Sequence, residues 1–529
     1  MHTACHRGCS IALALVVAMT TMPLAARADP TDVTIDSGAI KGIVEDGVYS
    51  FKGIPYAAPP LGILRWRVPQ SVVAWEGVRL VDAFGPACMQ ADNIPRSEDC
   101  LTLNVWRPIA RASNAPLPVM VWIYGGALVH GNTAMYPGDA LARQGVIVVS
   151  MNYRLGRLGF FAHPALAKEA PDDVRGNFGY MDQLAALEWV KRNISAFGGD
   201  PDKVTIFGES AGGGSVIAHM ISPLSRGLFH RAILQSPGIP TARAKVLPLT
   251  TLADAEQRAI AYAGTLGVMG EGMDALEALR SLPAEKLVEG ASSGAVLAGL
   301  TVGKPVSGVS GAILDGRFLS ETPEAALSAG RQAMVAVMVG ANSRDLGIGA
   351  AETKDDLFAL FGSGAAEAQS VYDPTGKEPF GELKHQVLAD MTLVEPSRSF
   401  ADAMVRADQP TWWYRFSYVA GSLRTDPIWT GTLHGFEIPY VFNIPSAHVS
   451  DKVTEGDEAM AAVTSAYWIA FAKSGDPNGG DRPMWPRHDP MVDRVINFTN
   501  GGVVVGPDPL KRRLDLWQKV WSGEGGHAP

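Results

Sequence analysis

A serine stands among glycines in the stretch TIFGESAGGGS, which covers residues 205–215. The apolar run 204–207 in front of it is typical of a buried strand, and residues 212–222 can start a helix. In the pattern G-x-S-x-G between a strand and a helix, the two glycines allow a sharp bend that leaves the serine hydroxyl exposed. A phosphate-binding loop would need a lysine and a dinucleotide-binding loop would need G-x-G-x-x-G, and this stretch has neither. The pattern therefore predicts that Ser210 is a nucleophile.

A nucleophilic serine also needs backbone donors for an oxyanion, a base, and a carboxylate that orients the base. The stretch VMVWIYGGALVHG, residues 119–131, is a predicted strand that runs into Gly125, Gly126 and Ala127. Small residues at this place let backbone N–H groups approach a reacting carbonyl group. The helix after Ser210 offers further free N–H groups at its N-terminus. His130 follows the glycines, and we expect it to serve in packing, with a place in the lining of the pocket as the alternative.

The elements that must position these residues follow from the apolar pattern. Short apolar runs predict buried parallel strands at residues 119–124, 146–151, 204–207, 232–235 and 335–339. Between them, the stretch MDQLAALEWVKRN at 181–193 has its leucines and Val190 at helical spacing. Strands that alternate with helices predict an α/β fold, with a mostly parallel central sheet and helices on both faces. Ligands of such folds bind at the carboxyl ends of the strands, where Ser210 is expected.

Longer stretches extend this pattern over most of the chain. They include FKGIPYAAPPLGILRW, SEDCLTLNVW, PVMVWIYGGA, NYRLGRLGFF, GNFGYMDQLAALEWVKRN, LFHRAILQS, LHGFEIPYVF and FAKSGDPN. In these stretches the chain resembles the type-B carboxylesterases, the family that includes the cholinesterases and bacterial para-nitrobenzyl esterases. The resemblance covers roughly residues 33–520. It implies an α/β-hydrolase fold and a serine hydrolase whose partner is a small-molecule carboxylic ester.

The resemblance also indicates the base and the acid. His434, in TLHGFEIPYVF, matches the catalytic histidine of the family. The family pattern G-x-N-x-D-E-G has its glutamate five residues after the first glycine, whereas GANSRDLG has Asp345 at that position, counted from Gly340. Aspartate serves as the acid in many α/β-hydrolases, and the order Ser, Asp, His fits the fold. Glu352, in a segment that does not align, is the alternative acid.

In the family, the glycine-rich loop and the bend at the serine supply the oxyanion donors. The resemblance therefore implies that these donors are the N–H groups of Gly126, Ala127 and Ala211. Ala127 stands where a third glycine is commoner in the family. Its N–H group is retained, but the added methyl group reduces the room for a bulky alcohol. The resemblance further implies a buried polar network behind the triad, with Glu209, Ser236 and Glu437 as its members.

Other function classes share this fold. Adhesion proteins of the neuroligin type bind partners and lack the serine or the histidine, whereas Ser210 and His434 are both present here. An amidase or peptidase would use the same triad, and the sequence leaves this alternative open. The motif H-E-x-x-H does not occur, and two cysteines cannot form a cysteine-based zinc set. We therefore expect no metal and no cofactor.

The start of the chain is expected to be a targeting segment. The apolar run 11–18 and the small residues at 26 and 28 are typical of a signal peptide, which predicts cleavage after residue 28 and export to the periplasm or the exterior. No linker, charge block or repeat divides residues 29–529, which we therefore expect to form one domain. The formal net charge of −9 argues against nucleic acid or an anionic membrane surface as a partner. After cleavage no stretch is apolar enough to enter a membrane, and the oligomeric state stays open.

Two of the four cysteines would leave with the signal peptide, so that Cys88 and Cys100 remain. In an exported protein this pair is expected to form a disulfide, with two buried thiols as the alternative. In the family that the chain resembles, cholinesterases bind the choline ammonium group on a tryptophan. This tryptophan lies in the loop that their first disulfide closes. Here that loop has eleven residues and no aromatic one, so we expect no preference for choline esters. The stretches 290–311 and 350–380 show no resemblance, and the natural ester stays open.

Overall fold

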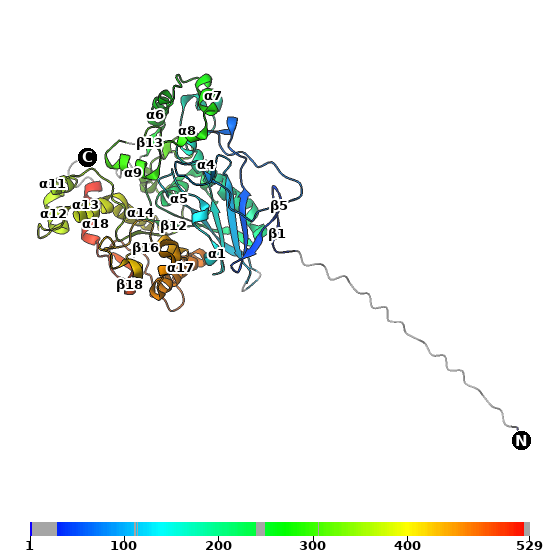
Figure 1. Cartoon of the computed structure of the whole chain (residues 1–529). Helices are drawn as coiled ribbons and strands as arrows, with labels where there is room; N and C mark the ends of the chain where they lie inside the picture. Colours follow the sequence, from blue (N-terminus) through cyan, green and yellow to red (C-terminus); the bar gives the residue numbers. More distant parts are fainter. Residues whose placement is uncertain (3–28, 111–112, 114, 240–248, 305, 523–529) are drawn as a thin grey trace.

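A large mixed sheet forms the centre of the molecule (Figure 1). The computed structural model describes residues 1–2, 29–110, 113, 115–239, 249–304 and 306–522. The expected signal peptide lies almost entirely outside the described residues. The strand order is β18-β17-β16-β15-β12-β11-β9-β10-β8-β4-β3, and all neighbours from β17 to β10 are parallel. The expectation of a mostly parallel sheet is confirmed.

The predicted strands lie next to one another in the parallel part of the sheet. They are β9 (Leu117–Ile123), β10 (Ile147–Met151), β11 (Gly199–Glu209), β12 (Arg231–Gln235) and β15 (Ala336–Asn342). Most of their side chains are buried because helices cover both faces, which explains the apolar runs in the sequence. The parallel part continues with β16 (Thr411–Phe416) and β17 (Arg494–Thr499). Its antiparallel flanks are β3 (Ile43–Glu45), β4 (Val48–Pro55), β8 (Thr102–Pro108) and β18 (Gly502–Pro507).

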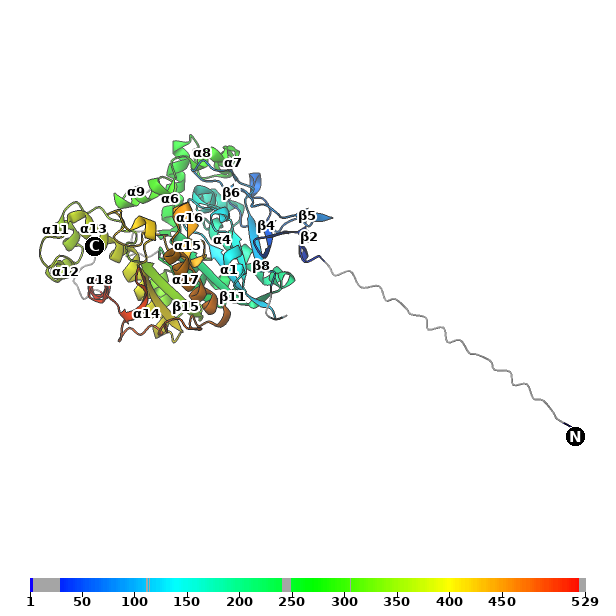
Figure 2. The same ribbon diagram turned by 60° about the horizontal axis from the view of Figure 1, so that its bottom comes forward.

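Helices pack on both faces of this sheet (Figure 2). The helices α5 (Ala211–Ile221) and α14 (Glu395–Arg406) contact its central strands on one face. On the other face lie α1 (Asp139–Ala142) and α17 (Glu455–Ser474). The helix predicted at 181–193 is present and begins earlier, as α4 (Phe178–Asn193). The layers therefore follow the expected α/β arrangement.

Further helices form smaller apolar clusters outside these layers. One cluster surrounds Trp66 and Phe161, and its helices are α6 (Leu252–Thr265), α7 (Met273–Ser281) and α8 (Ala284–Val288). Another joins the C-terminal helix α18 (Lys511–Ser522) to α11 (Lys354–Ala359), α12 (Ala365–Tyr372) and α13 (Phe380–Ala389). The stretch 290–311 contains α9 (Ser293–Thr301). Both stretches without a family resemblance therefore contain helices.

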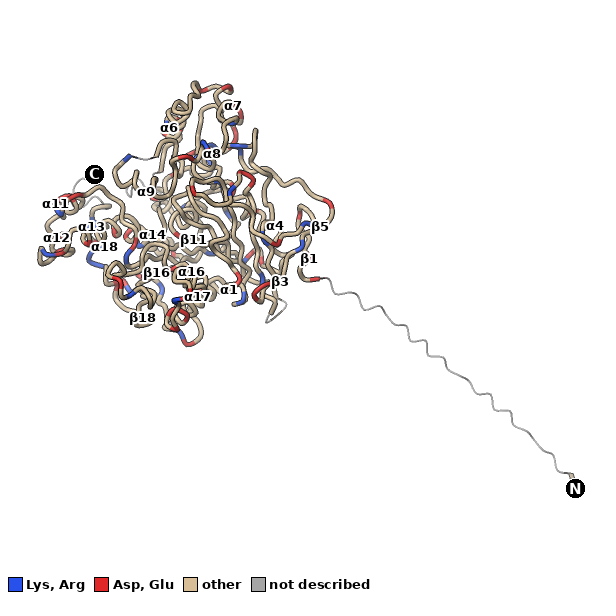
Figure 3. The backbone as a smooth tube through the Cα atoms, viewed as in Figure 1, with Lys and Arg blue, Asp and Glu red and all other residues tan. Residues whose placement is uncertain are grey.

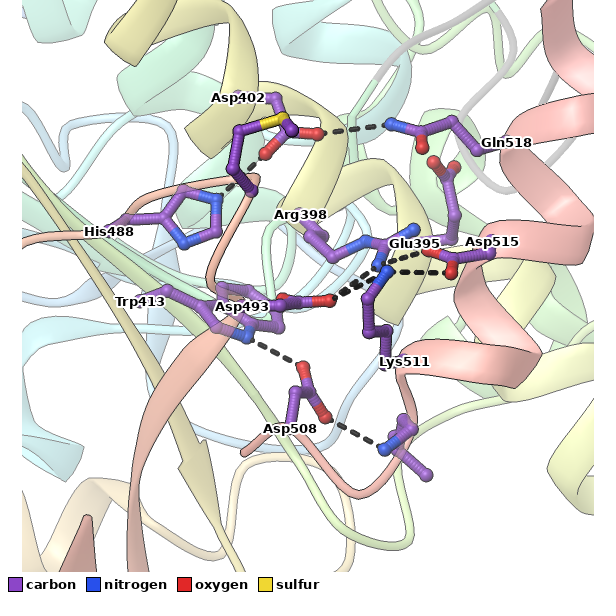
Figure 4. A network of polar contacts seen from close by, with 12 residues as sticks. Glu395, Arg398, Asp402, Trp413, His488, Asp493, Asp508, Lys511, Asp515 and Gln518 are labelled. Carbon is purple, nitrogen blue, oxygen red and sulfur yellow. Dashed lines mark hydrogen bonds and ion pairs between the residues drawn. The ribbon is translucent and has the colours of Figure 1, made fainter. Parts of the chain in front are cut away.

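A buried ionic network holds the C-terminal helix against the rest of the molecule (Figure 4). Arg398 on α14 lies 3.3 Å from Asp493 and 2.9 Å from Asp515 on α18. Gln518 on α18 donates a hydrogen bond of 3.0 Å to Asp402 on α14. Arg398 and Asp493 are both buried, and each has a further partner, because Lys511 lies 3.5 Å from Asp493 and Asp515 pairs with Arg398.

The predicted disulfide between Cys88 and Cys100 is present. Cys88 ends the strand β6 (Ala87–Cys88), which pairs with β7 (Arg96–Ser97) inside the loop that the disulfide closes. Acidic and basic side chains are mixed along the chain rather than segregated by sign (Figure 3). Among the helices that the structure describes, none is long and apolar enough to cross a membrane.

Candidate active site

A cavity of about 400 Å³ lies at the carboxyl ends of the parallel strands. Ser210, which directly follows β11, lines this cavity together with His434 and the loop that follows β9. This is the edge of a parallel sheet at which ligands bind. The other walls include Met135, Tyr136, Ser293, Leu297, Phe436 and His448.

The turn at Ser210 has a strained backbone. Its φ of 56° and ψ of −123° lie in a region that side-chain-bearing residues rarely adopt, at a cost of roughly 1–3 kcal/mol. Backbone hydrogen bonds hold the turn, because Ser210 N–H donates to Gln235 and Gly214 N–H donates to Ser210, both at 2.9 Å. A Cβ atom at Gly212 would overlap the carbonyl oxygen of Ile123, so glycine is needed where the helix passes the strand.

The structure brings Ser210, His434 and Asp345 into one hydrogen-bonded chain. His434 Nε2 lies 2.8 Å from Ser210 Oγ, and His434 Nδ1 lies 2.6 Å from Asp345 Oδ1. The three residues come from different places: the end of β11, the loop after β15, and the loop after β16. In this arrangement a carboxylate can orient the imidazole, and the imidazole can in turn activate the hydroxyl group.

Asp345 is only 1% exposed, and every direction around its carboxylate is occupied by a donor. Besides His434, it accepts hydrogen bonds from Ser236 Oγ at 2.6 Å and from the N–H groups of Asn342 and Leu346, both at 2.9 Å. Burial favours the neutral acid, but His434 and these donors outweigh that effect and hold the pKa of Asp345 below its usual value. Asp345 is therefore ionised in its buried position.

The alternative acid, Glu352, lies outside this arrangement. It is exposed, and its backbone N–H group donates to Asp356 at the start of α11. Within the part of the chain that the structure describes, no hydrogen bond or ion pair joins Glu352 to His434. The geometry therefore favours Asp345 over Glu352.

A second carboxyl group approaches the imidazole from the side of the serine. Glu209 Oε1 lies 3.2 Å from His434 Nε2. Burial raises the pKa of Glu209 to about 8. Burial by itself lowers the pKa of His434, but Glu209 and Asp345 favour the imidazolium more strongly and raise that pKa above its usual value. Glu209 therefore contributes to how readily His434 is protonated.

Glu437 lies behind these residues and is fully buried. It accepts hydrogen bonds from Gln235 at 3.0 Å and from Asn342 at 2.5 Å. The expected network members Glu209, Ser236 and Glu437 are thus all buried around His434 and Asp345. Gln235 and Asn342 were missed by sequence reasoning, although both stand next to residues that it singled out. Their positions were the available signal, because Gln235 directly precedes Ser236 and Asn342 lies within the stretch GANSRDLG.

The loop after β9 carries free backbone donors toward the cavity. Gly126 and Ala127 have φ angles of 92° and 55°, and a Cβ at Gly126 would overlap the carbonyl oxygen of His130. Ala127 therefore keeps a left-handed conformation that favours glycine. Considering only the described residues, the N–H groups of Gly126, Ala127 and Ala211 donate to no other protein group. Gly126 and Ala127 line the cavity and Ala211 directly follows Ser210, and unpaired N–H groups at these positions suit a negatively charged oxygen.

The remaining walls of the cavity are largely apolar. Ser293 and Leu297 come from α9, whose sequence resembled nothing, so no sequence signal placed them here. His448 packs against Phe436 with ring centroids 4.1 Å apart, and burial lowers its pKa to about 4, so it is neutral near pH 7. His130 is not part of the described lining; its Nδ1 lies 2.7 Å from Asp92 Oδ2. Neither lysine nor arginine occurs among the described lining residues.

Comparison with known proteins gives the family. A model of the carboxylesterase family matches residues 29–370 and 363–517. The fumonisin B1 esterase of Sphingopyxis macrogoltabida is 37% identical over 539 residues, which cover 96% of this chain and 94% of that protein. The para-nitrobenzyl esterase of Bacillus subtilis is 35% identical over 93% of this chain and 99% of its own length. The cocaine esterase of Oryctolagus cuniculus is 34% identical over 89% and 91%, respectively.

These similarities extend over nearly the whole of both chains in each pair. They agree with the central parallel sheet and its surrounding helices, which are the α/β-hydrolase architecture of this family. The protein therefore belongs to the carboxylesterase family and is a carboxylic ester hydrolase.

Proposed function

We propose that this esterase works through an acyl-enzyme on Ser210, with His434 as the base and Asp345 as the orienting acid. The observation that carries the proposal is the hydrogen-bonded chain from Ser210 Oγ through His434 to Asp345. His434 Nε2 takes the Ser210 proton while Ser210 Oγ attacks the ester carbonyl carbon. The resulting imidazolium donates that proton to the alcohol oxygen as the carbon–oxygen bond breaks.

Water then releases the acid from Ser210 by the same sequence of steps. His434 takes a proton from the water, the hydroxide attacks the acyl carbon, and the proton passes to Ser210 Oγ. The free N–H groups of Gly126, Ala127 and Ala211 would hold the oxyanion in both steps. Asp345 stays ionised, fixes the imidazole tautomer and stabilises the imidazolium.

The lining of the cavity supports a neutral ester as the substrate. Its described walls are mostly apolar and carry no lysine or arginine that would pair with an acidic group on a substrate. The loop between Cys88 and Cys100 contains no aromatic side chain for a quaternary ammonium group. An amidase activity of the same triad is the alternative, which a comparison of a matched ester and anilide would decide. Export to the periplasm or the exterior remains part of the proposal.

Replacement of Ser210 by alanine tests the nucleophile. We expect Ser210→Ala to lower kcat for para-nitrophenyl acetate by about a million-fold, because the members of a triad act as a unit. An organophosphate should label the parent enzyme once and leave the variant unmodified, as mass spectrometry would show. Labelling of another serine in the parent enzyme would contradict the assignment.

The choice between two carboxylates can be tested with a matched pair of amide variants. Asp345→Asn should lower kcat by about ten-thousand-fold, because the imidazole loses the charge that orients it. Glu352→Gln, which changes an exposed side chain, should keep nearly full activity. Circular dichroism should show that both variants fold. The opposite pattern of activity would make Glu352 the acid.

The role of Glu209 appears in the pH dependence of kcat/KM. Activity should rise with pH as His434 loses its proton, with an inflection above the ordinary imidazole value of about 6.5, since the nearby carboxylates favour the imidazolium. Glu209→Gln removes one of them and should move the inflection to lower pH. Glu352→Gln is the control and should not move it. An unchanged or higher inflection in Glu209→Gln would show that Glu209 does not act on His434.

Acetylcholine and its uncharged carbon analogue, 3,3-dimethylbutyl acetate, test the substrate class. We expect no advantage for the choline ester, because its cation finds no aromatic side chain in the disulfide loop. The measurement is kcat/KM for both esters with one enzyme preparation. A tenfold advantage for acetylcholine, which corresponds to ~1.4 kcal/mol, would disprove the expectation.

A further inference from the structure

A second cavity, of about 220 Å³, lies on the other side of the loop that carries Asp345. Residues of this loop, from Asn342 to Asp345, form one wall, and α13 and the start of α18 form the others. Arg415 on β16 also lines it. Ser210 and His434 line only the first cavity among the described pockets, so the second one is not part of the substrate site.

Three arginines line this second cavity, and two of them are neutralised. Arg344 lies 2.6 Å from Glu382, and Arg513 lies 2.6 Å from Asp390. The remaining lining carboxylate, Asp345, is already saturated by His434, Ser236 and two backbone donors. The carboxylates that line the cavity therefore form their ion pairs and hydrogen bonds with residues other than Arg415.

Arg415 is the cation that lacks such a partner. As far as the structure describes the chain, its guanidinium makes one hydrogen bond, a long one of 3.4 Å to the carbonyl oxygen of Ser343, and no ion pair. The carboxylate of Asp508 lies in the same region, but Trp413 Nε1 donates to it at 3.0 Å and Leu510 N–H at 2.8 Å, and it does not line the cavity. A guanidinium offers five N–H donors and stays charged in proteins, so most of the donors of Arg415, which lines the cavity, have no partner among the described residues.

Other polar atoms of the lining also lack protein partners. His385 Nε2 and Asn342 Oδ1 are buried and make no hydrogen bond to another described residue. Buried polar groups without partners are costly, and a cavity of this size has room for a ligand together with water. The cavity also reaches the surface, because Thr430 at its edge is exposed. The lining thus includes a residue at the molecular surface, where a small polar molecule would enter to reach Arg415.

We propose that this cavity is a binding site for a small oxyanion, a carboxylate or inorganic phosphate, with Arg415 as its anchor. The planar fork of a guanidinium matches the paired oxygens of both groups and forms two charge-assisted hydrogen bonds to them. The proposal goes beyond ester hydrolysis, since the site lies outside the substrate cavity. It adds that the loop carrying Asp345 contacts a bound anion on its far side.

Equilibrium dialysis of the purified protein with radiolabelled inorganic phosphate, at constant ionic strength, tests the site. We expect about one phosphate per chain and at least a roughly tenfold weaker affinity in Arg415→Gln, because the paired hydrogen bonds are lost. Arg494→Gln removes one exposed arginine from the neighbouring strand β17 and should bind as the parent does. Arg415→Lys keeps the charge without the fork and should bind with intermediate affinity.

Competition by acetate distinguishes the two sources of the oxyanion. Displacement of phosphate by acetate supports a site that also accepts carboxylates, and failure to displace it supports a site for phosphate. The variant Ser210→Ala should bind phosphate normally, so the result is independent of the proposed nucleophile. Absence of binding to the parent protein at about 10 mM phosphate, a concentration at which even a weak millimolar site would be largely filled, would overturn the proposal. Equal affinity in the parent and a folded Arg415→Gln would overturn it as well.

Discussion

Asp345 is a charged carboxylate that is almost fully buried, and the arrangement of the active site follows from this constraint. An isolated carboxylate cannot be buried without a large loss of solvation, so donors must surround it. Ser236, the backbone of its own loop and His434 provide them. Because His434 is one of these donors, the bond that keeps Asp345 ionised also directs the free nitrogen of the ring toward Ser210.

The geometry around Ser210 depends on a different physical effect. Ser210 occupies an unfavourable backbone conformation, which is stabilised by backbone hydrogen bonds to β12 and into α5. Gly212 lets that helix pass close to β9, and the N–H group of Ala211 is free beside the serine because Ala211 is the first residue of the helix. The strained turn therefore places a hydroxyl group and a free backbone N–H group next to each other.

Carboxyl groups surround His434 on more than one side. Asp345 binds one ring nitrogen, Glu209 lies near the other, and Glu437 is held behind them by Gln235 and Asn342. Burial raises the pKa values of Glu209 and Glu437, and the charge of Glu437 raises the pKa values of both Glu209 and His434. The protonation of the histidine is thus a property of the whole buried cluster rather than of one pair.

Much of the fold and of the candidate site could be predicted from the sequence. Strands such as β9 and β11 could be predicted because burial on both faces of the sheet requires an unbroken apolar run in the sequence. The family resemblance placed Asp345 despite its departure from the usual glutamate, since position in the loop decides which carboxylate reaches the histidine. By contrast, Leu297 on α9 could not be placed in the cavity wall, because its segment matched no known pattern.

The sequence by itself determined the local geometry, since the bend at Ser210 depends on the small residues beside it and the strands on the runs within them. Only the tertiary structure decided which distant groups meet. His434 and Asp345 are 89 positions apart, and their 2.6 Å contact requires the ends of two neighbouring strands to be in register. The sequence likewise does not show that Arg415 forms no ion pair with any described residue, because ion pairing depends on packing in space. Short-range steric constraints depend on residues that are adjacent in the sequence, whereas long-range contacts depend on how the whole sheet and its helices pack.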